Sequence, residues 1–204
     1  MEEAKLKVEI IAHTIDPEKT AATAAHMCYA GVTVEELKKK MEPEKVKKLI
    51  SNIVEAGHLS VLEHASFTFA IEGVSRALTH QLVRHRIASF SQQSQRYVNE
   101  QNMKFIIPPA IKGNAELKKD YENFAEESRK LYKKLVDAGI KKEDARFILP
   151  NACETRIIVT MNTRALYNFF ERRLCTRAQW EIRMLADEML KEARKVSPLI
   201  FGRT

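Results

Sequence analysis

Residues 65–86, ASFTFAIEGVSRALTHQLVRHR, contain the pattern that decides the fold. Apolar residues alternate with other residues over 65–71, which predicts a β-strand with one buried face. The large apolar members of that face are Phe67, Phe69 and Ile71. Gly73 is expected to end the strand, and Ser75 is expected to start a helix that runs to about Arg84. A strand and a helix thus lead directly into a group of cationic side chains.

Strand and helix signals recur on both sides of this stretch. Further strands are expected over 8–12 and 155–161, with a short strand-like piece over 105–107 before two prolines. Helix starts are expected at Asp16 with Pro17, at the capping box of Thr33 and Glu36, at Pro43 and at Asn114. The helices begun at Pro43 and Asn114 should stop at Gly57 and Gly139, and others are expected over 141–149, 163–174 and 177–195. Residues 87–103 are polar and aperiodic, so we expect an ordered loop or an irregular extended segment there.

This combination of few strands with long helices predicts an α+β fold (mixed α/β). One small mixed or antiparallel sheet should be packed by the long helices. The length of 204 residues, without a repeat or a low-complexity linker, favours a single domain over residues 1–204.

Composition argues against several classes of protein. The chain is 45% apolar and 30% charged, which suits a packed core under a solvated surface. No apolar run approaches the roughly 20 residues needed to cross a bilayer, and no apolar signal core follows the charged first residues, MEEAK. Cys28, Cys153 and Cys175 are too few and too scattered for a disulfide framework or a zinc site. We therefore expect a cytoplasmic protein with no membrane partner and no metal.

The basic residues are distributed unevenly along the chain. The net charge of +7 implies attraction to anions without saying which. Lysines fall in runs near glutamates, as in 38–40 and 133–134, which is typical of solvated helix faces. Arginines gather instead in 84–96, 146–156 and 164–177. Because a guanidinium binds phosphate in a bidentate manner, this clustering indicates an anion site.

The densest cluster is the stretch RHRIASFSQQSQRY, residues 84–97. If the preceding helix continued, Arg84 and Arg86 would project about 200° apart, so they could not hold the same group. Either the helix ends here or the two side chains address different ligands. Ser94 and Arg96 lie on one side of an extended segment and suit a phosphate. The alternative for Arg-His-Arg alone is a basic surface face, because so short a motif is often fortuitous.

The whole pattern is more specific than its parts. Arg-His-Arg, seven intervening residues and then Ser-x-Arg resembles the signature of the flavin-dependent thymidylate synthases. Further blocks are similar in order and spacing: AHTIDPEKTAATAAHMCYA, HLSVLEHASFTF, HQLVRHR, ARFILP, NTRALYNFFERR and AQWEIR. The resemblance covers nearly the whole chain and is least diagnostic over 114–138. It implies the fold of that family.

The resemblance also implies roles for individual residues. Those implied to bind dUMP are Gln81, Arg84, Gln92, Gln93, Ser94, Gln95, Arg96, Arg146 and Arg173. Those implied to bind FAD are Ser60, Arg84, His85, Arg86, Gln92, Asn162, Arg164 and Asn168. Arg173 is the implied catalytic residue, because it would contact the uracil ring and favour ionisation at N3. Arg172 beside it is the alternative in register, and Gln92 stands where relatives often have glutamate.

The residues themselves bear on some of these roles. Arg146 is a cation in the apolar stretch 145–150, so burial would require an anionic partner. Asn162 is positioned as a helix N-cap, a structural role that can coexist with cofactor binding. Arg164 and Asn168 are four residues apart and therefore share one helical face. Glutamine in place of glutamate at position 92 keeps an acceptor, adds donors and removes a charge.

The implied reaction is the reductive methylation of dUMP to dTMP. Methylenetetrahydrofolate would be the one-carbon donor, and FAD reduced by NADPH would carry the hydride. The implied assembly is a homotetramer with FAD-binding sites shared between subunits. No Gly-x-Gly-x-x-Gly fingerprint follows the first expected strand, so a Rossmann mode of FAD binding is not expected. None of the three cysteines lies in a Pro-Cys-His context, so a thiol nucleophile is not evident.

Two rival functions belong to other classes. A nucleic-acid-binding module would use the arginine clusters on phosphates and lose affinity steeply with salt. The chain carries no recognised nucleic-acid-binding motif beside its basic clusters, so we expect no nucleic-acid partner. A flavin-dependent nucleotide oxidoreductase without methyl transfer is the other rival.

Overall fold

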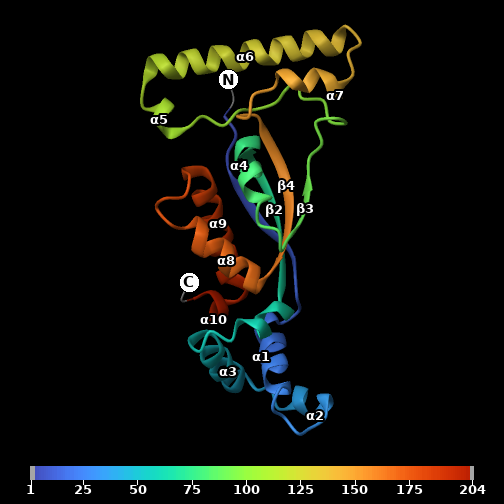
Figure 1. Cartoon of the computed structure of the whole chain (residues 1–204), viewed down its shortest axis with the longest axis vertical. Helices are drawn as coiled ribbons and strands as arrows, with labels where there is room; N and C mark the ends of the chain where they lie inside the picture. The colour runs from blue at the N-terminus through green and yellow to red at the C-terminus, as the bar shows by residue number, and fades with distance from the viewer. Residues whose placement is uncertain (1–2, 203–204) are drawn as a thin grey trace. The chain divides into compact units, whose positions relative to one another are not determined.

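The computed structural model describes residues 3–202, which divide into two compact units. The described residues of the first unit are 3–7, 71–84 and 91–157, and those of the second are 8–70, 85–90 and 158–202. Figure 1 labels most of the helices and strands, which are numbered in chain order. The single domain predicted over 1–204 stays a prediction, and its residues 1–2 and 203–204 lie outside the described part.

Four strands form one antiparallel sheet in the order β1-β2-β4-β3. Their bounds are β1 Lys7–His13, β2 Ser66–Ser75, β3 Ser89–Gln92 and β4 Glu154–Asn162. The strands predicted over 8–12, 65–71 and 155–161 are therefore confirmed. So is the α+β class with one small sheet, because helices make up most of the remaining structure.

The helices of each unit lie on segments that the sequence largely predicts. The first unit contains α4 Arg76–Leu82, α5 Pro109–Lys112, α6 Ala115–Asp137, α7 Lys142–Ala145 and the 3₁₀ turn η2 Arg146–Ile148. The second contains α1 Pro17–Met27, α2 Val34–Lys39, α3 Pro43–Glu55, the 3₁₀ helix η1 Leu59–His64, α8 Thr163–Arg173, α9 Trp180–Val196 and α10 Pro198–Phe201. No helix within residues 3–202 is both long enough and apolar enough to span a membrane.

The prediction that Gly73 ends the second strand is wrong, because β2 continues to Ser75. Gly73 has φ +72° and packs against the backbone of Lys5, whose carbonyl oxygen would lie 1.9 Å from an added Cβ. Glycine thus allows a close approach within the strand instead of a stop. The helix start at Ser75 is confirmed, since its side chain accepts a hydrogen bond from the Leu78 amide at 2.9 Å.

The irregular segment predicted over 87–103 contains a strand and is in part a wrong prediction. Residues Ser89–Gln92 form β3 beside β4, and the Gln93 amide then donates to the Arg156 carbonyl at 2.9 Å. Strand β3 ends the sheet order, and its side chains are exposed or half-buried, so its sequence lacks the apolar alternation of an internal strand. The short strand-like segment predicted over 105–107 is not one of the four strands. Its residue Phe105 forms isolated β-bridges with Glu3 and Cys153.

The predicted helix caps are confirmed at Thr33 and Asn114 but not at Asp16. Thr33 and Glu36 form both bonds of the capping box, and Asn114 accepts from the first turn of α6 at 3.1 Å. Asp16 occupies the N-cap position with φ 44°, and its side chain makes no capping bond. Helix α9 begins at Trp180, three residues later than predicted, because the Gln179 side chain caps it.

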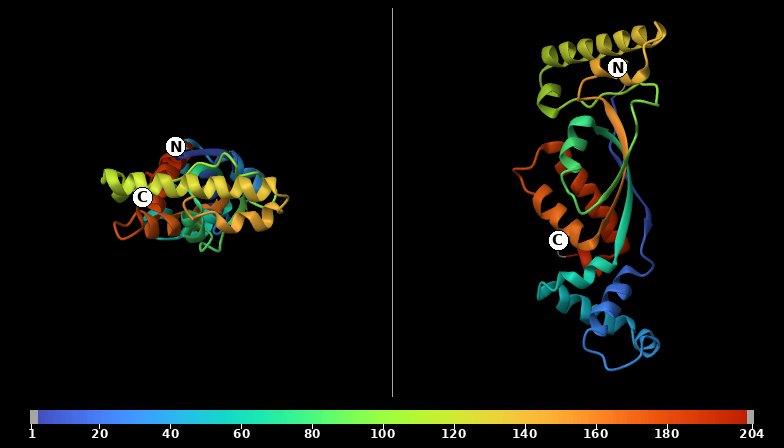
Figure 2. Two further views of the ribbon diagram at one scale, coloured as in Figure 1. Left: turned by 90° about the horizontal axis from the view of Figure 1, so that it is seen from above. Right: turned by 45° about the vertical axis from the view of Figure 1, so that its right-hand side comes forward.

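Each unit has its own buried core. In the first unit, α6 packs against α5, α7 and η2 (Figure 2). Tyr132 of α6 is buried in one cluster with Phe105 and Cys153. In the second unit, the Phe201 ring lies edge-on to Phe67 and Phe170, at centroid distances of 5.5 and 5.9 Å. Burying an aromatic side chain of this kind contributes about 1.5–3 kcal/mol of stability.

Candidate functional site

The second unit brings His85 and Arg173 into direct contact. Arg173 lies at the end of α8, and its Nε donates a hydrogen bond to Nε2 of His85 at 3.0 Å. The imidazole also lies edge-on to Phe169, with ring centroids 5.0 Å apart. Both polar side chains are partly buried. The two residues are 88 positions apart in sequence, so the fold creates this contact.

This contact depends on the protonation state of His85. Burial, followed by the positive charges of Arg173 and Arg172, lowers the pKa of His85 to about 4. Near neutral pH the imidazole is therefore uncharged, and its Nε2 can accept from the guanidinium. A neutral hydrogen-bonding ring thus helps to orient a cation without cancelling its charge.

The end of α8 also borders an arginine-lined hollow of about 480 Å³. Its lining residues are Glu171, Arg172, Arg173, Cys175, Arg177 and Ala178. Hydrogen bonds from the backbone and then the side chain of Arg177 lower the pKa of the Cys175 thiol. Three guanidinium groups make the hollow suitable for an anion. Arg172 and Arg173 both line it, but Arg173 is the one that contacts His85.

Several residues predicted to bind FAD lie on two packed elements of the second unit. Helix α8 packs against η1, which carries Ser60 on an exposed position. Asn162 caps α8 by accepting from the Ala165 amide at 2.8 Å. Arg164 Nη1 donates to Glu63 Oε1 of η1 at 2.6 Å, and Asn168 is exposed one helical turn later. Their hydroxyl, amide and guanidinium groups can all donate hydrogen bonds to phosphate or ribose oxygens.

In the first unit, two arginines predicted to bind dUMP contact Glu143, and a serine from the same predicted set contacts one of them. The Nε and Nη2 atoms of Arg96 both lie 3.0 Å from Oε2 of Glu143. Ser94 Oγ accepts from the Arg96 amide at 3.2 Å, and Arg146 Nε donates to the Glu143 carbonyl at 3.1 Å. A ligand phosphate at Arg96 would therefore replace or join a carboxylate that already holds the guanidinium.

Gln92 is tied into the first unit through its amide nitrogen. This nitrogen donates to the hydroxyls of Thr79 at 3.0 Å and Thr155 at 3.2 Å, both of which are buried. The hydroxyl of Thr79 in turn donates to the Arg76 carbonyl at 2.9 Å. The donors of Gln92 are thus used inside the fold, which leaves its carbonyl oxygen as the group suited to a ligand.

The arrangement around Arg84 resolves the alternative that the sequence left open. Helix α4 ends at Leu82, so Arg84 and Arg86 do not continue it. Both arginines are exposed. The remaining predicted dUMP residues, Gln81, Gln93 and Gln95, are half-buried.

The predicted residues therefore divide between the two units. The first unit holds Gln81, Arg84, Gln92, Gln93, Ser94, Gln95, Arg96 and Arg146. The second unit holds Arg173 with Ser60, His85, Arg86, Asn162, Arg164 and Asn168. Apart from Arg84 and Gln92, the residues predicted to bind FAD all lie in the second unit.

The sequence did not point to the carboxylates that hold two of these arginines. Glu143 is 47 residues from Arg96, and Glu63 is 101 residues from Arg164, so no local spacing links either pair. The only sequence signal for Glu143 is its place three residues before Arg146, within one helical turn. Thr79 and Thr155 likewise carry no local signal for their bonds to Gln92.

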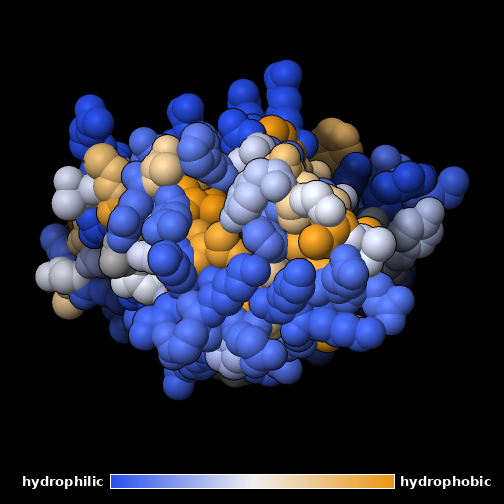
Figure 3. All heavy atoms as spheres, turned by 90° about the horizontal axis from the view of Figure 1, so that it is seen from below, coloured by the Kyte–Doolittle hydropathy of each residue, from blue (hydrophilic) through white to orange (hydrophobic). Residues whose placement is uncertain are grey.

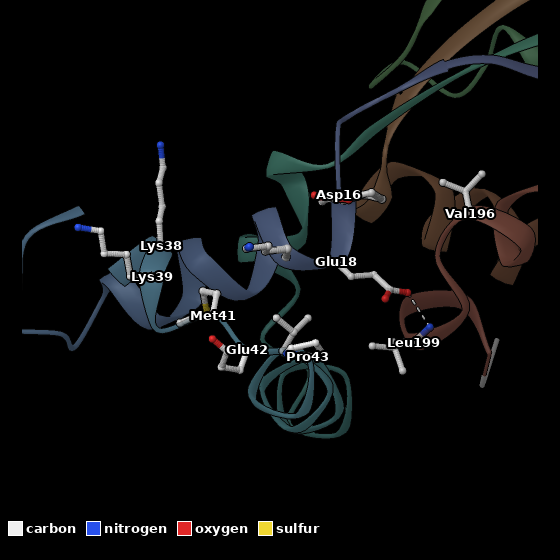
Figure 4. Close-up of a pocket in the computed structure, with 12 residues that line it drawn as sticks. Asp16, Glu18, Lys38, Lys39, Met41, Glu42, Pro43, Val196 and Leu199 are labelled. Carbon is white, nitrogen blue, oxygen red and sulfur yellow. Dashed lines mark hydrogen bonds between the residues drawn. The ribbon is translucent and has the colours of Figure 1, made fainter. Parts of the chain in front are cut away.

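A second hollow in the second unit has a structural role. Glu18 points toward Leu199 (Figure 4) and accepts a hydrogen bond from its amide at 2.7 Å. Burial raises the pKa of Glu18. Lysines of α2 and apolar residues of α3 and α9 also line the hollow. The face of the molecule drawn in Figure 3 has mostly hydrophilic side chains around a smaller apolar area. Among residues 3–202, no cluster of three or more His, Cys, Asp or Glu side chains could hold a metal ion.

Comparison with known proteins identifies the family of this chain. A family model described as "Thymidylate synthase complementing protein" matches residues 9–199. The chain belongs to this family. Three relatives named "Flavin-dependent thymidylate synthase" confirm the predicted resemblance. The relative from Clostridium tetani is 50% identical over 96% of this chain and 85% of its own length. That from Geobacter sulfurreducens is 51% identical with the same coverage, and that from Pyrococcus furiosus is 47% identical over 96% and 83%.

Proposed function

We propose that this chain catalyses the reductive methylation of dUMP to dTMP. In balance, dUMP, methylenetetrahydrofolate, NADPH and a proton give dTMP, tetrahydrofolate and NADP⁺. Family membership and the names of the relatives support a thymidylate synthase that depends on a flavin. The observation that carries the proposal is the Arg173–His85 contact at the arginine-lined hollow.

Arg173 is the catalytic residue of this proposal. Its guanidinium would contact the uracil ring and stabilise the negative charge that forms when N3 ionises. A fixed cation beside a developing anion lowers a reaction barrier by a few kcal/mol. His85 would keep this guanidinium in place, because the neutral imidazole accepts its Nε hydrogen bond.

The phosphate of dUMP would bind to Ser94 and Arg96, beside Glu143. Ser94 Oγ and the Arg96 guanidinium supply donors, and Arg146 is tied to the same helical turn. Arg96 would exchange all or part of its bond to Glu143 for the phosphate. Gln81, Arg84, Gln93 and Gln95 complete the proposed nucleotide-binding set.

The donor chemistry of α8 and η1 fits FAD. Ser60, Asn162, Arg164 and Asn168 offer hydroxyl, amide and guanidinium groups to phosphate and ribose oxygens, with His85 and Arg86 in the same unit. Arg84 and the carbonyl oxygen of Gln92 complete this set. When bound and reduced by NADPH, FAD supplies the hydride of the reaction. The ion pair to Glu63 would orient Arg164 before binding.

We further propose a cytoplasmic homotetramer in which FAD-binding sites are shared between subunits. Two features support sharing. The chain has many arginines for its length, and the proposed dUMP and FAD residues belong mainly to different units of the chain. Folate and NADPH are the further ligands of this assembly, without nucleic acid or membrane.

Two measurements on the purified full-length protein test the proposed reaction. The visible spectrum should show an oxidised flavin that bleaches when NADPH is added under anaerobic conditions. Tritium release from 5-labelled dUMP should then require both NADPH and methylenetetrahydrofolate. A colourless protein that no added FAD activates would contradict the proposal, as would NADPH oxidation without folate-dependent tritium release.

A further inference from the structure

Helix α6 (Ala115–Asp137) exposes a stripe of three large apolar side chains. Its members Leu117, Phe124 and Leu131 follow one another at intervals of seven residues, so they lie almost on one line along the helix. Their exposed fractions are 53%, 59% and 45%. Single exposed apolar residues are common, but an aligned row of three large ones indicates an interaction surface.

A groove runs beside this stripe within the first unit. It encloses about 540 Å³ and is lined by Phe124 and Leu131 of α6 together with Ile148 of η2. Its polar lining comes from the α6 residues Glu127, Ser128, Lys130 and Lys134. An apolar side chain from a partner could therefore enter the groove while charged groups meet along its edge.

The charges of α6 are polarised along its length. Residues 116–127 contain five acidic and two basic side chains, for a net charge of −3, whereas 129–137 contain four basic and one acidic, for a net charge of +3. Phe124 lies midway between Leu117 and Leu131 in sequence. The stripe is thus the same in both directions, while the charge pattern reverses.

We propose that α6 pairs with α6 of a second copy of this chain, antiparallel and about a twofold axis near Phe124. A twofold interface brings the same surface from both partners together. In this arrangement Leu117 of each copy faces Leu131 of the other, and each acidic half faces a basic half. Parallel pairing would instead place like charges together along the whole helix.

The ion pairs already present on α6 do not oppose this pairing. Lys118–Glu122 and Lys130–Glu127 lie within one helix at 3.9 and 3.6 Å, and the first pair is half-buried while the second is exposed. Such pairs contribute at most about 0.5 kcal/mol each. Asp120 and Lys134, which flank the stripe, form no ion pair with another residue of the described chain. Their charges therefore suit contacts with the second copy. The proposed pairing does not depend on the proposed chemistry.

The first test replaces the centre of the stripe. Phe124→Glu keeps a good helix former at an exposed position, so the helix should persist, but it places two carboxylates at the twofold axis. The molar mass in sedimentation equilibrium should fall to half that of the unmodified protein. Phe124→Leu and Lys119→Glu, the latter on the opposite face of α6, should keep the full mass. A Phe124→Glu protein of full mass, or an unmodified protein that is monomeric, would overturn the inference.

The second test uses charge and does not depend on Phe124. Asp120→Lys with Glu127→Lys changes the acidic half to a net charge of about +1, and Lys130→Glu with Lys134→Glu changes the basic half to about −1. Each double variant alone should associate at least tenfold more weakly, because its facing halves now repel. An equimolar mixture of the two should recover the full mass. If each double variant associates normally, or if the mixture gains no mass, antiparallel α6 pairing is wrong.

Discussion

Arg96 and Arg173 are held in two different ways. Arg96 of the first unit pairs with the carboxylate of Glu143, and the arginine is exposed while the glutamate is half-buried. Arg173 of the second unit donates to the neutral imidazole of His85, and both side chains are partly buried. The first contact pairs two opposite charges, whereas the second joins a cation to an uncharged ring.

The difference indicates how each arginine would meet an anion. A ligand at Arg96 has to compete with Glu143, so the occupancy of this site should respond to salt and to the charge at position 143. A ligand at Arg173 does not compete with His85, because the imidazole is neutral. That site should respond to pH instead, through the protonation of His85. In this proposal, Arg96 exchanges its bond to Glu143 for the phosphate, whereas Arg173 keeps its bond to His85 when the ligand binds.

The largest effect should come from removing Arg173. We expect Arg173→Ala to lower the turnover number for dTMP formation by about 100- to 1,000-fold, because a guanidinium aimed at a developing anion is lost. Bound FAD, measured by its visible absorbance, should remain. The matched control is Arg172→Ala, which removes the exposed neighbour from the same hollow. Equal losses in the two variants, or near-normal turnover in Arg173→Ala, would contradict the assignment.

The next effect concerns pH and stability. The pKa of His85 is lowered to about 4 in the folded protein from an ordinary value near 6.5. The unfolded chain therefore binds more protons between these values, so stability should fall as the pH drops from about 6.5 to about 4. We expect a loss of about 1–2 kcal/mol, roughly half of the full pKa difference, because the partly exposed ring is screened by solvent.

Urea unfolding at a series of pH values measures this loss. His85→Gln keeps an acceptor for Arg173 but does not titrate, so it should flatten the His85 part of the profile. If the two proteins lose stability in parallel over this range, the proposed dependence on His85 is wrong.

The smallest effect should come from removing the charge of Glu143, which pairs with Arg96. Glu143→Gln removes the charge that competes for Arg96, so dUMP should bind up to about fivefold more tightly, as expected from losing an exposed ion pair. Calorimetric titration of the FAD-loaded protein at low ionic strength measures the change. Glu35→Gln, which breaks the exposed pair with Lys39, should leave dUMP binding unchanged. Weaker binding in Glu143→Gln would show that Glu143 supports the site instead of competing for it.

Local sequence signals predicted the elements well where a side chain acts within one turn or strand. The capping box of Thr33 and Glu36 and the cap at Asn114 are of this kind. The role of Gly73 has no local signal, because it is a close approach to Lys5, 68 residues earlier in the chain. Strand β3 was missed because its polar residues pair through the backbone at the end of the sheet order.

The same distinction applies to the candidate site. The arginines were found from their clustering, and the resemblance supplied their expected roles. Their partners were not found, because His85 with Arg173 and Glu143 with Arg96 meet only after the chain has folded. A single sequence indicates which side chains can bind an anion, but not which protein group holds each of them beforehand.

The packing of α10 has a consequence for how the second unit is made in the cell. Phe201 packs edge-on against Phe67 and Phe170, and Glu18, near the start of the unit in sequence, accepts a hydrogen bond from the Leu199 amide. This core therefore cannot close until residue 201 has left the ribosome, even though α1 and α3 emerge early. Because α1 and α3 pack fully only after α10 is synthesised, they are expected to fold slowly and to need protection from aggregation during synthesis.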